Sequence, residues 1–282
     1  MLLFDQIPAL KSYVRESHQA QKTIGFVPTM GALHAGHLSL IERAIAENDL
    51  VICSIFVNPL QFNNQQDYTK YPRIFEDDIN MLAKYPNLYL FLPDEATMYA
   101  DTPLLKLDFG ALEQVMEGKH RPGHFNGVGI VVAKLFHLVQ PDKAYFGQKD
   151  LQQCRIIERM VKDLSFDLEL VICPTIREDD GLAMSSRNLR LSAEQRKHAL
   201  LLPQALFLAQ DLITKEQKDF SVVRQTIIDF LEPTPLRLEY FEIVHSQTLQ
   251  SINTIADSTH IALCIVAYLG EVRLIDNVLM VL

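Results

Sequence analysis

Two histidines lie in a glycine-containing turn between an apolar strand and an amphipathic helix. His34 and His37 are three residues apart, and Gly36 lies between them. A helix start directs unpaired backbone N–H groups and the positive end of its dipole outward, and both favour a phosphate. Residues three apart share a helix face, so both imidazoles can donate to one anion. The pattern indicates a nucleotide phosphate site, whereas a lone histidine in such a turn would be expected only to cap or pack.

Two later turns carry further groups that suit a triphosphate. Gly147–Asp150 follows an apolar strand and precedes a helix, so Lys149 could contact phosphate while Asp150 accepts from ribose hydroxyls. Asp150 is also a good helix cap, and the two roles are compatible. Met184–Arg187 places two hydroxyls and a guanidinium in a polar turn, which are suitable donors to phosphate oxygens. Ser-Ser-Arg alone is equally typical of a surface turn.

Alternating strands and helices are expected to position these turns. The expected strands are 24–27, 50–57, 88–92, 143–146 and 168–173, and the expected helices are 37–47, 74–84, 127–139 and 151–163. This alternation predicts an α/β fold with a doubly wound, parallel, Rossmann-like sheet. In such sheets ligands bind beyond the carboxyl ends of the strands. The segments Pro28–His37, Asn58–Gln61 and Gly147–Gln153 all follow strand ends, so they should meet in one crevice.

From about residue 176 the pattern changes to that of a second, smaller α+β domain. Helices are expected at 192–214 and 220–231, followed by strands at 238–244, 260–268 and 272–281. Proline at position 174 ends a strand, and a charged segment with a glycine follows it. We therefore expect two domains, at residues 1–175 and 176–282.

The composition restricts the class of protein. A chain of 282 residues with 48% hydrophobic residues can bury a sizeable core in two domains. Its net charge of −9 argues against binding to nucleic acid or to an anionic membrane. No stretch approaches the roughly 20 apolar residues of a membrane span, and Met1–Phe4 is too short for a signal sequence. Four cysteines without Cys-x-x-Cys spacing indicate free thiols, so we expect a cytoplasmic protein.

The His-x-Gly-His motif resembles the signature of the nucleotidyltransferase superfamily, which includes class I aminoacyl-tRNA synthetases and small adenylyltransferases. The surrounding blocks narrow the resemblance to the pantothenate synthetase family. These blocks are Pro28–Gly31, Ser54–Phe62, Tyr71–Arg73, Arg121–Phe125, Phe146–Gln153, Asp180–Asn188 and the segment from Leu269 to Asn277. So many ordered matches along one chain do not arise by chance.

The resemblance implies an AMP-forming ligase that condenses (R)-pantoate with β-alanine. Its product would be pantothenate, the precursor of coenzyme A, formed through a pantoyl adenylate with release of pyrophosphate and AMP. ATP would be a substrate accompanied by Mg2+. A homodimer is also implied, for which the apolar run Val128–Val139 is a candidate packing segment. Two alternatives are another adenylyltransferase of the superfamily, whose product retains AMP, and a nucleotide-binding regulator without turnover.

The resemblance also assigns residues to roles. Residues 1–175 would bind nucleotide and pantoate, and 176–282 would form a lid. Catalytic roles fall on His37, His34 and Lys149. The implied ATP contacts are Met30, Gly31, Ala32, Leu33, His34, Ala35, Gly36, His37, Gly147, Gln148, Lys149, Asp150, Ile176, Met184, Ser185, Ser186 and Arg187. The implied substrate contacts are Gln61, Gln153, Met30, Phe56, Asn58, Tyr71 and Arg121.

Several of these assignments have a specific chemical basis. Gln61 and Gln153 carry amides that can both donate and accept, as a hydroxy acid requires, and the resemblance gives Gln61 a further contact with β-alanine. Gln148 stands where the family usually has glutamate. Asp77 and Asp78 could assist Mg2+, although adjacent acids on a helix are more typical of a solvated face.

Overall fold

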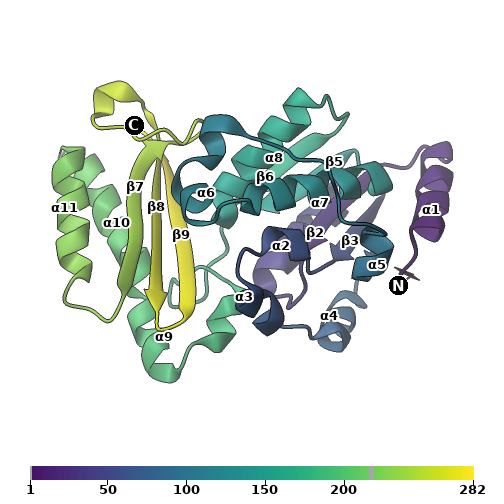
Figure 1. Cartoon of the computed structure of the whole chain (residues 1–282), viewed down its shortest axis with the longest axis horizontal. Coiled ribbons are helices and arrows are strands. Elements are labelled where there is room, and N and C mark those ends of the chain that lie inside the picture. The colour runs from purple at the N-terminus through teal and green to yellow at the C-terminus, as the bar shows by residue number, and fades with distance from the viewer. Residues whose placement is uncertain (1, 216–218) are drawn as a thin grey trace. The chain divides into compact units, whose positions relative to one another are not determined.

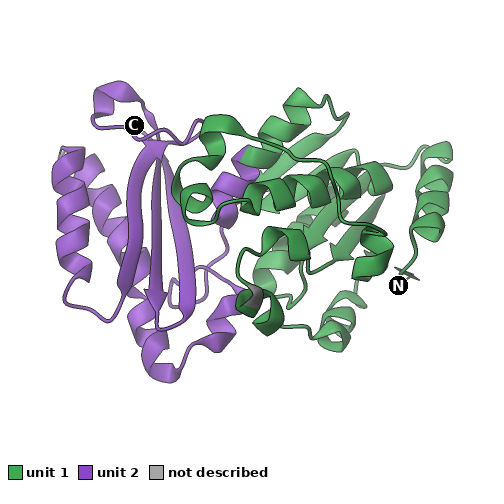
Figure 2. Cartoon of the chain, in the orientation of Figure 1, with its two compact units in different colours: residues 1–148, 156–174 green, residues 149–155, 175–282 purple. Residues whose placement is uncertain are grey.

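The computed structural model describes residues 2–215 and 219–282, so Met1, with which the first expected domain begins, lies outside the described residues. The chain divides into two compact units (Figures 1 and 2). Unit 1 comprises Met1–Gln148 and Ile156–Pro174, and unit 2 comprises Lys149–Arg155 and Thr175–Leu282. Each unit has its own sheet.

Unit 1 contains a six-stranded parallel sheet in the order β1-β4-β3-β2-β5-β6. The strands are β1 (Leu3–Phe4), β2 (Ile24–Thr29), β3 (Leu50–Ile55), β4 (Leu88–Phe91), β5 (Lys143–Gly147) and β6 (Glu169–Cys173). The chain runs from β2 toward β3 and β4 on one side and adds β5 and β6 on the other. The strand order therefore reverses beside β2, which confirms the doubly wound prediction. Ligands of open α/β sheets bind at such a reversal.

Helices pack on both faces of this sheet (Figure 1). The helices of this part of the chain are α1 (Ile7–Gln19), α2 (Ala35–Glu47), α3 (Gln65–Lys70), α4 (Phe75–Leu82), α5 (Glu95–Met98), α6 (Met116–His120), α7 (His124–Val139) and α8 (Leu151–Asp163), with 3-10 turns η1 (Pro59–Gln61), η2 (Gly110–Glu113) and η3 (Gln148–Asp150). Of these, η3 and α8 lie partly in unit 2, which takes Lys149–Arg155. Val27 packs in a core cluster with Ile41 of α2. Its neighbour Phe26 contacts the edge of Phe136 of α7, with ring centroids 6.3 Å apart. Successive strand residues thus fill opposite layers.

The apolar run Val128–Val139 packs within unit 1. It forms most of α7, where Phe136 is 2% exposed and Val139 is fully buried. These buried side chains are covered by the unit's own core, and the homodimer stays a prediction.

Unit 2 contains a three-stranded antiparallel sheet in the order β7-β8-β9. Its elements are η4 (Ser186–Arg190), α9 (Ala193–Ala199), α10 (Leu201–Thr214), α11 (Phe220–Leu231), β7 (Arg237–His245), η5 (Ile255–Asp257), β8 (His260–Leu269) and β9 (Val272–Val281). Leu206 of α10 and Ile227 of α11 are fully buried in one cluster with Ile265 of β8. This arrangement confirms the smaller α+β fold.

Two local features differ from the expectation. The helix expected at 192–214 is two helices that meet at Leu200, because Pro203 has no N–H to bond the preceding turn. Helix α1 was not predicted. Within the described residues all four cysteines are buried free thiols, and no helix is long and apolar enough to span a bilayer.

Candidate active site

The loop between β2 and α2 brings both histidines to the first turn of the helix. His34 is the N-cap of α2, and its Nδ1 accepts the N–H of Gly36 at 3.2 Å. The rings of His34 and His37 have centroids 4.1 Å apart. Because Nδ1 of His34 accepts, the neutral ring carries its proton on Nε2. His34 can therefore cap the helix through Nδ1 and still donate to an anion through Nε2, because these are different atoms of the ring.

Asp78 of α4 holds this loop from the protein interior. Its carboxylate is fully buried and accepts the N–H groups of Ala32, at 2.9 Å, and Leu33, at 2.7 Å. Gly31 and Ala32 both have left-handed φ angles, +80° and +49°. An L-residue in that region costs roughly 1–2 kcal/mol, so the two hydrogen bonds stabilise a strained backbone.

The interpretation of Asp77 and Asp78 as a solvated acidic face is therefore wrong for Asp78. Burial raises the pKa of its carboxyl, and the two backbone N–H groups oppose that shift. Since both oxygens accept backbone N–H groups, Asp78 acts here as a structural acceptor. A sequence spacing of 45 residues between Asp78 and Leu33 gave no local signal of this contact.

The turn η1 presents Gln61 after β3, the neighbour of β2 in the sheet. The Nε2 of Gln61 donates to the sulfur of Met30 at 3.0 Å, and its Oε1 accepts from Nδ2 of Asn58 at 3.2 Å. The same Nδ2 reaches the carbonyl of Gly127 at 3.1 Å, while Oδ1 of Asn58 accepts from the hydroxyl of Tyr99 at 2.9 Å. The structure therefore brings Met30, Asn58 and Gln61 together.

Helix α7 and its preceding turn also contact the backbone of Gln61. A ring nitrogen of His124 lies 2.7 Å from the carbonyl of Gln61, and Arg121 donates to the same oxygen at 3.4 Å. Gly127 is required here, because a Cβ atom at that position would lie 2.2 Å from the carbonyl oxygen of Leu60. Arg121 thus contacts the predicted site, because it donates to the backbone carbonyl of Gln61, a residue predicted to bind substrate.

The two aromatic candidates of unit 1 lie beside these groups. Phe56 is 6% exposed and packs edge-on against Tyr99, with centroids 5.9 Å apart. Tyr71 is 7% exposed and contacts Phe62, the residue after η1, at 5.8 Å. Phe56 thus contacts the tyrosine that donates to Asn58, and Tyr71 contacts the residue that follows Gln61.

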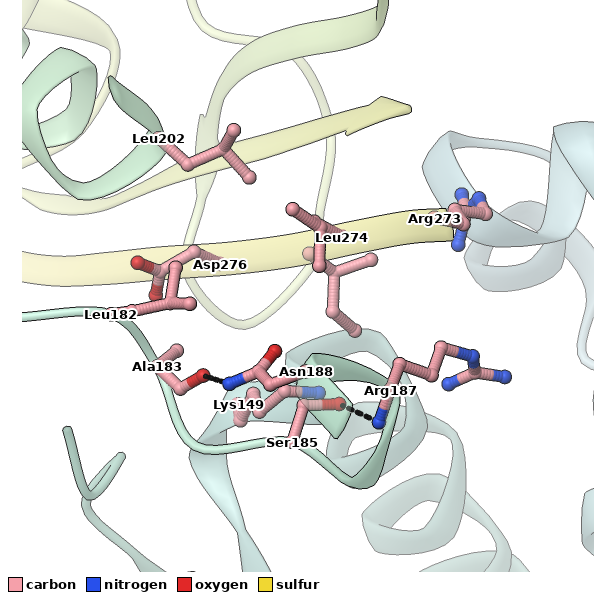
Figure 3. Close-up of a pocket in the computed structure, with 11 residues that line it drawn as sticks. Lys149, Leu182, Ala183, Ser185, Arg187, Asn188, Leu202, Arg273, Leu274 and Asp276 are labelled. Carbon is pink, nitrogen blue, oxygen red and sulfur yellow. Dashed lines mark hydrogen bonds between the residues drawn. The ribbon is translucent and has the colours of Figure 1, made fainter. Parts of the chain in front are cut away.

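In unit 2, Lys149 and the loop around Ser185 line one pocket, together with Asp276 of β9 (Figure 3). The side chain of Lys149 is 15% exposed, and its Nζ lies 3.7 Å from a carboxylate oxygen of Asp150. Gln153 is half-buried in the first turn of α8. A cation beside small polar groups suits an anionic ligand.

The predicted serine and arginine loop is joined to the chain that precedes it. The N–H of Met184 donates to the carbonyl of Ile176 at 3.0 Å. Ser185 caps η4 by accepting the N–H of Arg187 at 3.3 Å. Figure 3 shows the guanidinium of Arg187 pointing away from the hydroxyl of Ser185. The loop thus has a defined backbone, and Ser186, the first residue of η4, is buried.

The predicted residues consequently fall into two sets, each positioned within its own unit. In the described part of the chain, no group of three or more His, Cys, Asp or Glu side chains is placed to hold a metal ion. Unit 1 holds Met30–His37, Phe56, Asn58, Gln61, Tyr71, Arg121, Gly147 and Gln148, and unit 2 holds Lys149, Asp150, Gln153, Ile176 and Met184–Arg187.

A parallel sheet whose strand order reverses, with a helix start beside the reversal, is typical of nucleotide-binding α/β proteins. The family model described as pantoate-β-alanine ligase matches residues 2–279, and the chain belongs to this family. It is 47% identical to a pantothenate synthetase of Cytophaga hutchinsonii over 283 residues, covering 100% of both chains. It is also 47% identical to one of Porphyromonas gingivalis, covering 99% of each.

Solved structures are similar over the same length. A pantothenate synthetase of Thermus thermophilus has a TM-score of 0.92 and 41% identity, with 99% of each chain covered. A pantoate-β-alanine ligase of Francisella tularensis, complexed with β,γ-ATP and β-alanine, has a TM-score of 0.79 and 38% identity, covering 99% of this chain and 97% of that one. These comparisons confirm the family resemblance, while the roles of individual residues stay predictions.

Proposed function

We propose that this protein condenses pantoate with β-alanine in an ATP-dependent reaction that yields pantothenate. In the first step the pantoate carboxylate attacks the α-phosphate of ATP, which forms a pantoyl adenylate and expels pyrophosphate. In the second step the β-alanine amine attacks the acyl carbon, and the bond to AMP breaks. The family match over residues 2–279 supports this reaction.

The paired histidines of α2 are the structural observation that carries the proposal. Negative charge develops on the α-phosphate and the departing pyrophosphate, so fixed donors there lower the barrier. His34 and His37, with ring centroids 4.1 Å apart, can donate to neighbouring oxygens of one phosphate. The α2 dipole adds positive potential at the same place.

In unit 1 we assign Gln61 to pantoate and to β-alanine. Its amide is oriented by Asn58 and Met30, which supports a fixed direction for its donor and acceptor atoms. Met30 and Phe56 would contact the gem-dimethyl carbon of pantoate. A buried amide that contacts one substrate atom can discriminate against compounds that lack it.

In unit 2 we assign Lys149, Ser185, Ser186 and Arg187 to the phosphates of ATP, and Asp150 to the ribose. Gln153 would contact pantoate. A guanidinium and an ammonium are strong donors to phosphate oxygens. Closure of a loop over ATP would also exclude water, which would otherwise hydrolyse the adenylate.

We further propose that Mg2+ arrives with ATP, that the protein is a homodimer, and that it acts in the cytoplasm. Protein-bound Mg2+ commonly keeps several waters and takes phosphate oxygens as ligands. That mode fits a set of described residues without a dedicated acidic cage. The metal would neutralise phosphate charge, while the side chains named above orient the nucleotide.

The function is tested by pyrophosphate release from ATP and Mg2+ with pantoate alone, followed by addition of β-alanine. Pantoate-dependent pyrophosphate and β-alanine-dependent AMP and pantothenate, identified by mass spectrometry, are expected. A product that retains AMP after β-alanine is added would instead indicate another adenylyltransferase. Bound ATP without pyrophosphate release from folded protein would indicate a regulator.

A further inference from the structure

The last strand of unit 2 carries a buried acid and a buried amide at adjacent positions. Asp276 and Asn277 are 3% and 4% exposed, and both lie in β9 at an edge of the sheet. Successive side chains of a strand point to opposite faces, so the two can bond different segments. An aspartate is almost never fully buried unless it is paired.

Asp276 is paired with Arg177, which lies 99 positions earlier in the chain. The two guanidinium nitrogens donate to its two oxygens at 2.6 and 3.0 Å, and the N–H of Asn277 donates at 2.8 Å. Arg177 also donates to the carbonyl of Gly181 at 3.0 Å and lies over the ring of Phe207. A two-pronged pair of this kind fixes orientation as well as distance.

Further hydrogen bonds lead from Arg177 to the loop Met184–Arg187, which is predicted to contact phosphate. Arg177 forms an antiparallel β-bridge with Ala183, and the N–H of Glu178 donates to the carbonyl of Leu182 at 2.8 Å. Asn188 of η4 then donates to the carbonyl of Ala183 at 3.1 Å and to the carboxylate of Glu178 at 2.7 Å. A continuous set of hydrogen bonds therefore joins β9 to the turn that begins η4.

Asn277 bonds the segment that contains Lys149, the second part of unit 2 that is predicted to contact phosphate. Its Nδ2 donates to the backbone carbonyl of Lys149 at 2.9 Å, across 128 positions of sequence. In Figure 3, Lys149 and Asp276 lie at the same pocket as Ser185. Two neighbouring residues of one strand thus reach both segments that carry the unit's candidate phosphate donors.

We propose that Asp276 and Asn277 are positioning residues for the ATP triphosphate. Asp276 acts through Arg177 on the loop of Ser185–Arg187, and Asn277 acts on the backbone of Lys149. The inference rests on the proposed function, because that function assigns these donors to ATP. A displacement of about 1 Å in a reacting group can cost on the order of 100-fold in rate.

The test measures steady-state pyrophosphate release for Asn277→Ala, with Asn277→Asp as an isosteric variant that lacks the donor. We expect the kcat to fall by about 10- to 100-fold in both. The KM for pantoate should stay within about twofold, because no pantoate contact is changed. Thr234→Val is the matched control, since it removes a side-chain donor to another backbone carbonyl of unit 2, that of Leu231. Its kcat should be unchanged.

A double-mutant cycle separates positioning from general damage. If Asn277 acts through Lys149, then Asn277→Ala should have little further effect on kcat in a Lys149→Ala background. Multiplicative effects of the two substitutions, or a wild-type kcat for both Asn277 variants, would overturn the inference. Absence of pantoate-dependent pyrophosphate from the wild-type protein would instead overturn the proposed function, and the same assay distinguishes the two failures.

Arg177→Lys tests the other arm of the proposal. Lysine keeps the charge but cannot form the two parallel bonds to Asp276. We expect a rise in the KM for ATP together with a lower kcat. Unchanged values for both parameters would exclude Asp276 from positioning the loop.

Discussion

Replacement of Asp78 by asparagine should impair both stability and adenylation, although Asp78 contacts no substrate in the proposed mechanism. Its two oxygens accept the N–H groups of Ala32 and Leu33 at 2.9 and 2.7 Å. Asparagine has one acceptor oxygen and presents an NH2 group to the second N–H. One buried backbone donor therefore loses its partner, and the remaining bond loses its charge assistance.

The magnitude follows from these two losses. A buried N–H without a partner costs about 1–3 kcal/mol, and a neutral bond has roughly half the strength of a charge-assisted one. We expect the free energy of unfolding to fall by about 2–4 kcal/mol. Ala32 has a φ of +49° that these bonds help to hold, so the loop before His34 should relax. The kcat for pyrophosphate release should then fall at least about tenfold.

The assay combines urea unfolding with pyrophosphate release under saturating ATP and pantoate. Glu76→Gln is the control, because Glu76 lies in the first turn of the same helix but is exposed. That variant should stay within about 0.5 kcal/mol of the wild type and keep its kcat. Wild-type stability in Asp78→Asn, or full activity in a clearly destabilised Asp78→Asn, would refute the argument that this carboxylate sets the loop.

Three other outcomes are expected. His37→Ala should lower the kcat of pyrophosphate release by on the order of 100-fold, while calorimetry detects little change in ATP affinity; unchanged turnover would exclude its role. Gln153→Ala should raise the KM for pantoate more than the KM for ATP, and the reverse ratio would contradict the assignment. The Arg196 guanidinium lowers the pKa values of Glu178 and Asp180. That stabilisation is present above their unfolded pKa values of about 4 and is lost as the pH falls through the folded values. The loss of unfolding free energy in Arg196→Gln, about 0.5–1 kcal/mol at pH 7, should therefore become smaller as the pH is lowered below about 4; a loss in urea titrations that does not change with pH would oppose this reasoning.

Strong local patterns predicted much of the fold. The apolar runs that became β2 and β3 have no competing interpretation, since they are too short for helices and are bounded by turn residues. The break at Leu200 was missed because Pro203 falls within an otherwise continuous helical pattern. Helix α1 was missed although Leu10 and Val14, four residues apart, form its buried face. The helix is polar overall, although its few apolar side chains do fall on one face.

The site was predictable where chemistry and spacing coincide, as at His34 and His37. The hydrogen bonds that hold the site's segments in place were not predictable, because they join residues far apart in the sequence. Asp78 bonds Leu33 across 45 positions, and Asn277 bonds Lys149 across 128. No local spacing encodes such a pair, and an acid beside another acid, as at Asp78, suggests solvent instead.

The two buried aspartates, Asp78 and Asp276, stabilise their loops by different means. Their substitutions should therefore have different effects. Asp78 accepts neutral backbone N–H groups, so dipoles compensate its charge, and burial raises its pKa. Asp276 faces a guanidinium, which opposes the pKa increase that burial causes. Removing Asp78 leaves uncharged donors without acceptors inside the protein. Removing Asp276 leaves a cation, but the Arg177 side chain is 22% exposed and water can solvate part of it. Loss of Asp78 should therefore act mainly on the loop backbone, and loss of Asp276 mainly on the orientation of Arg177.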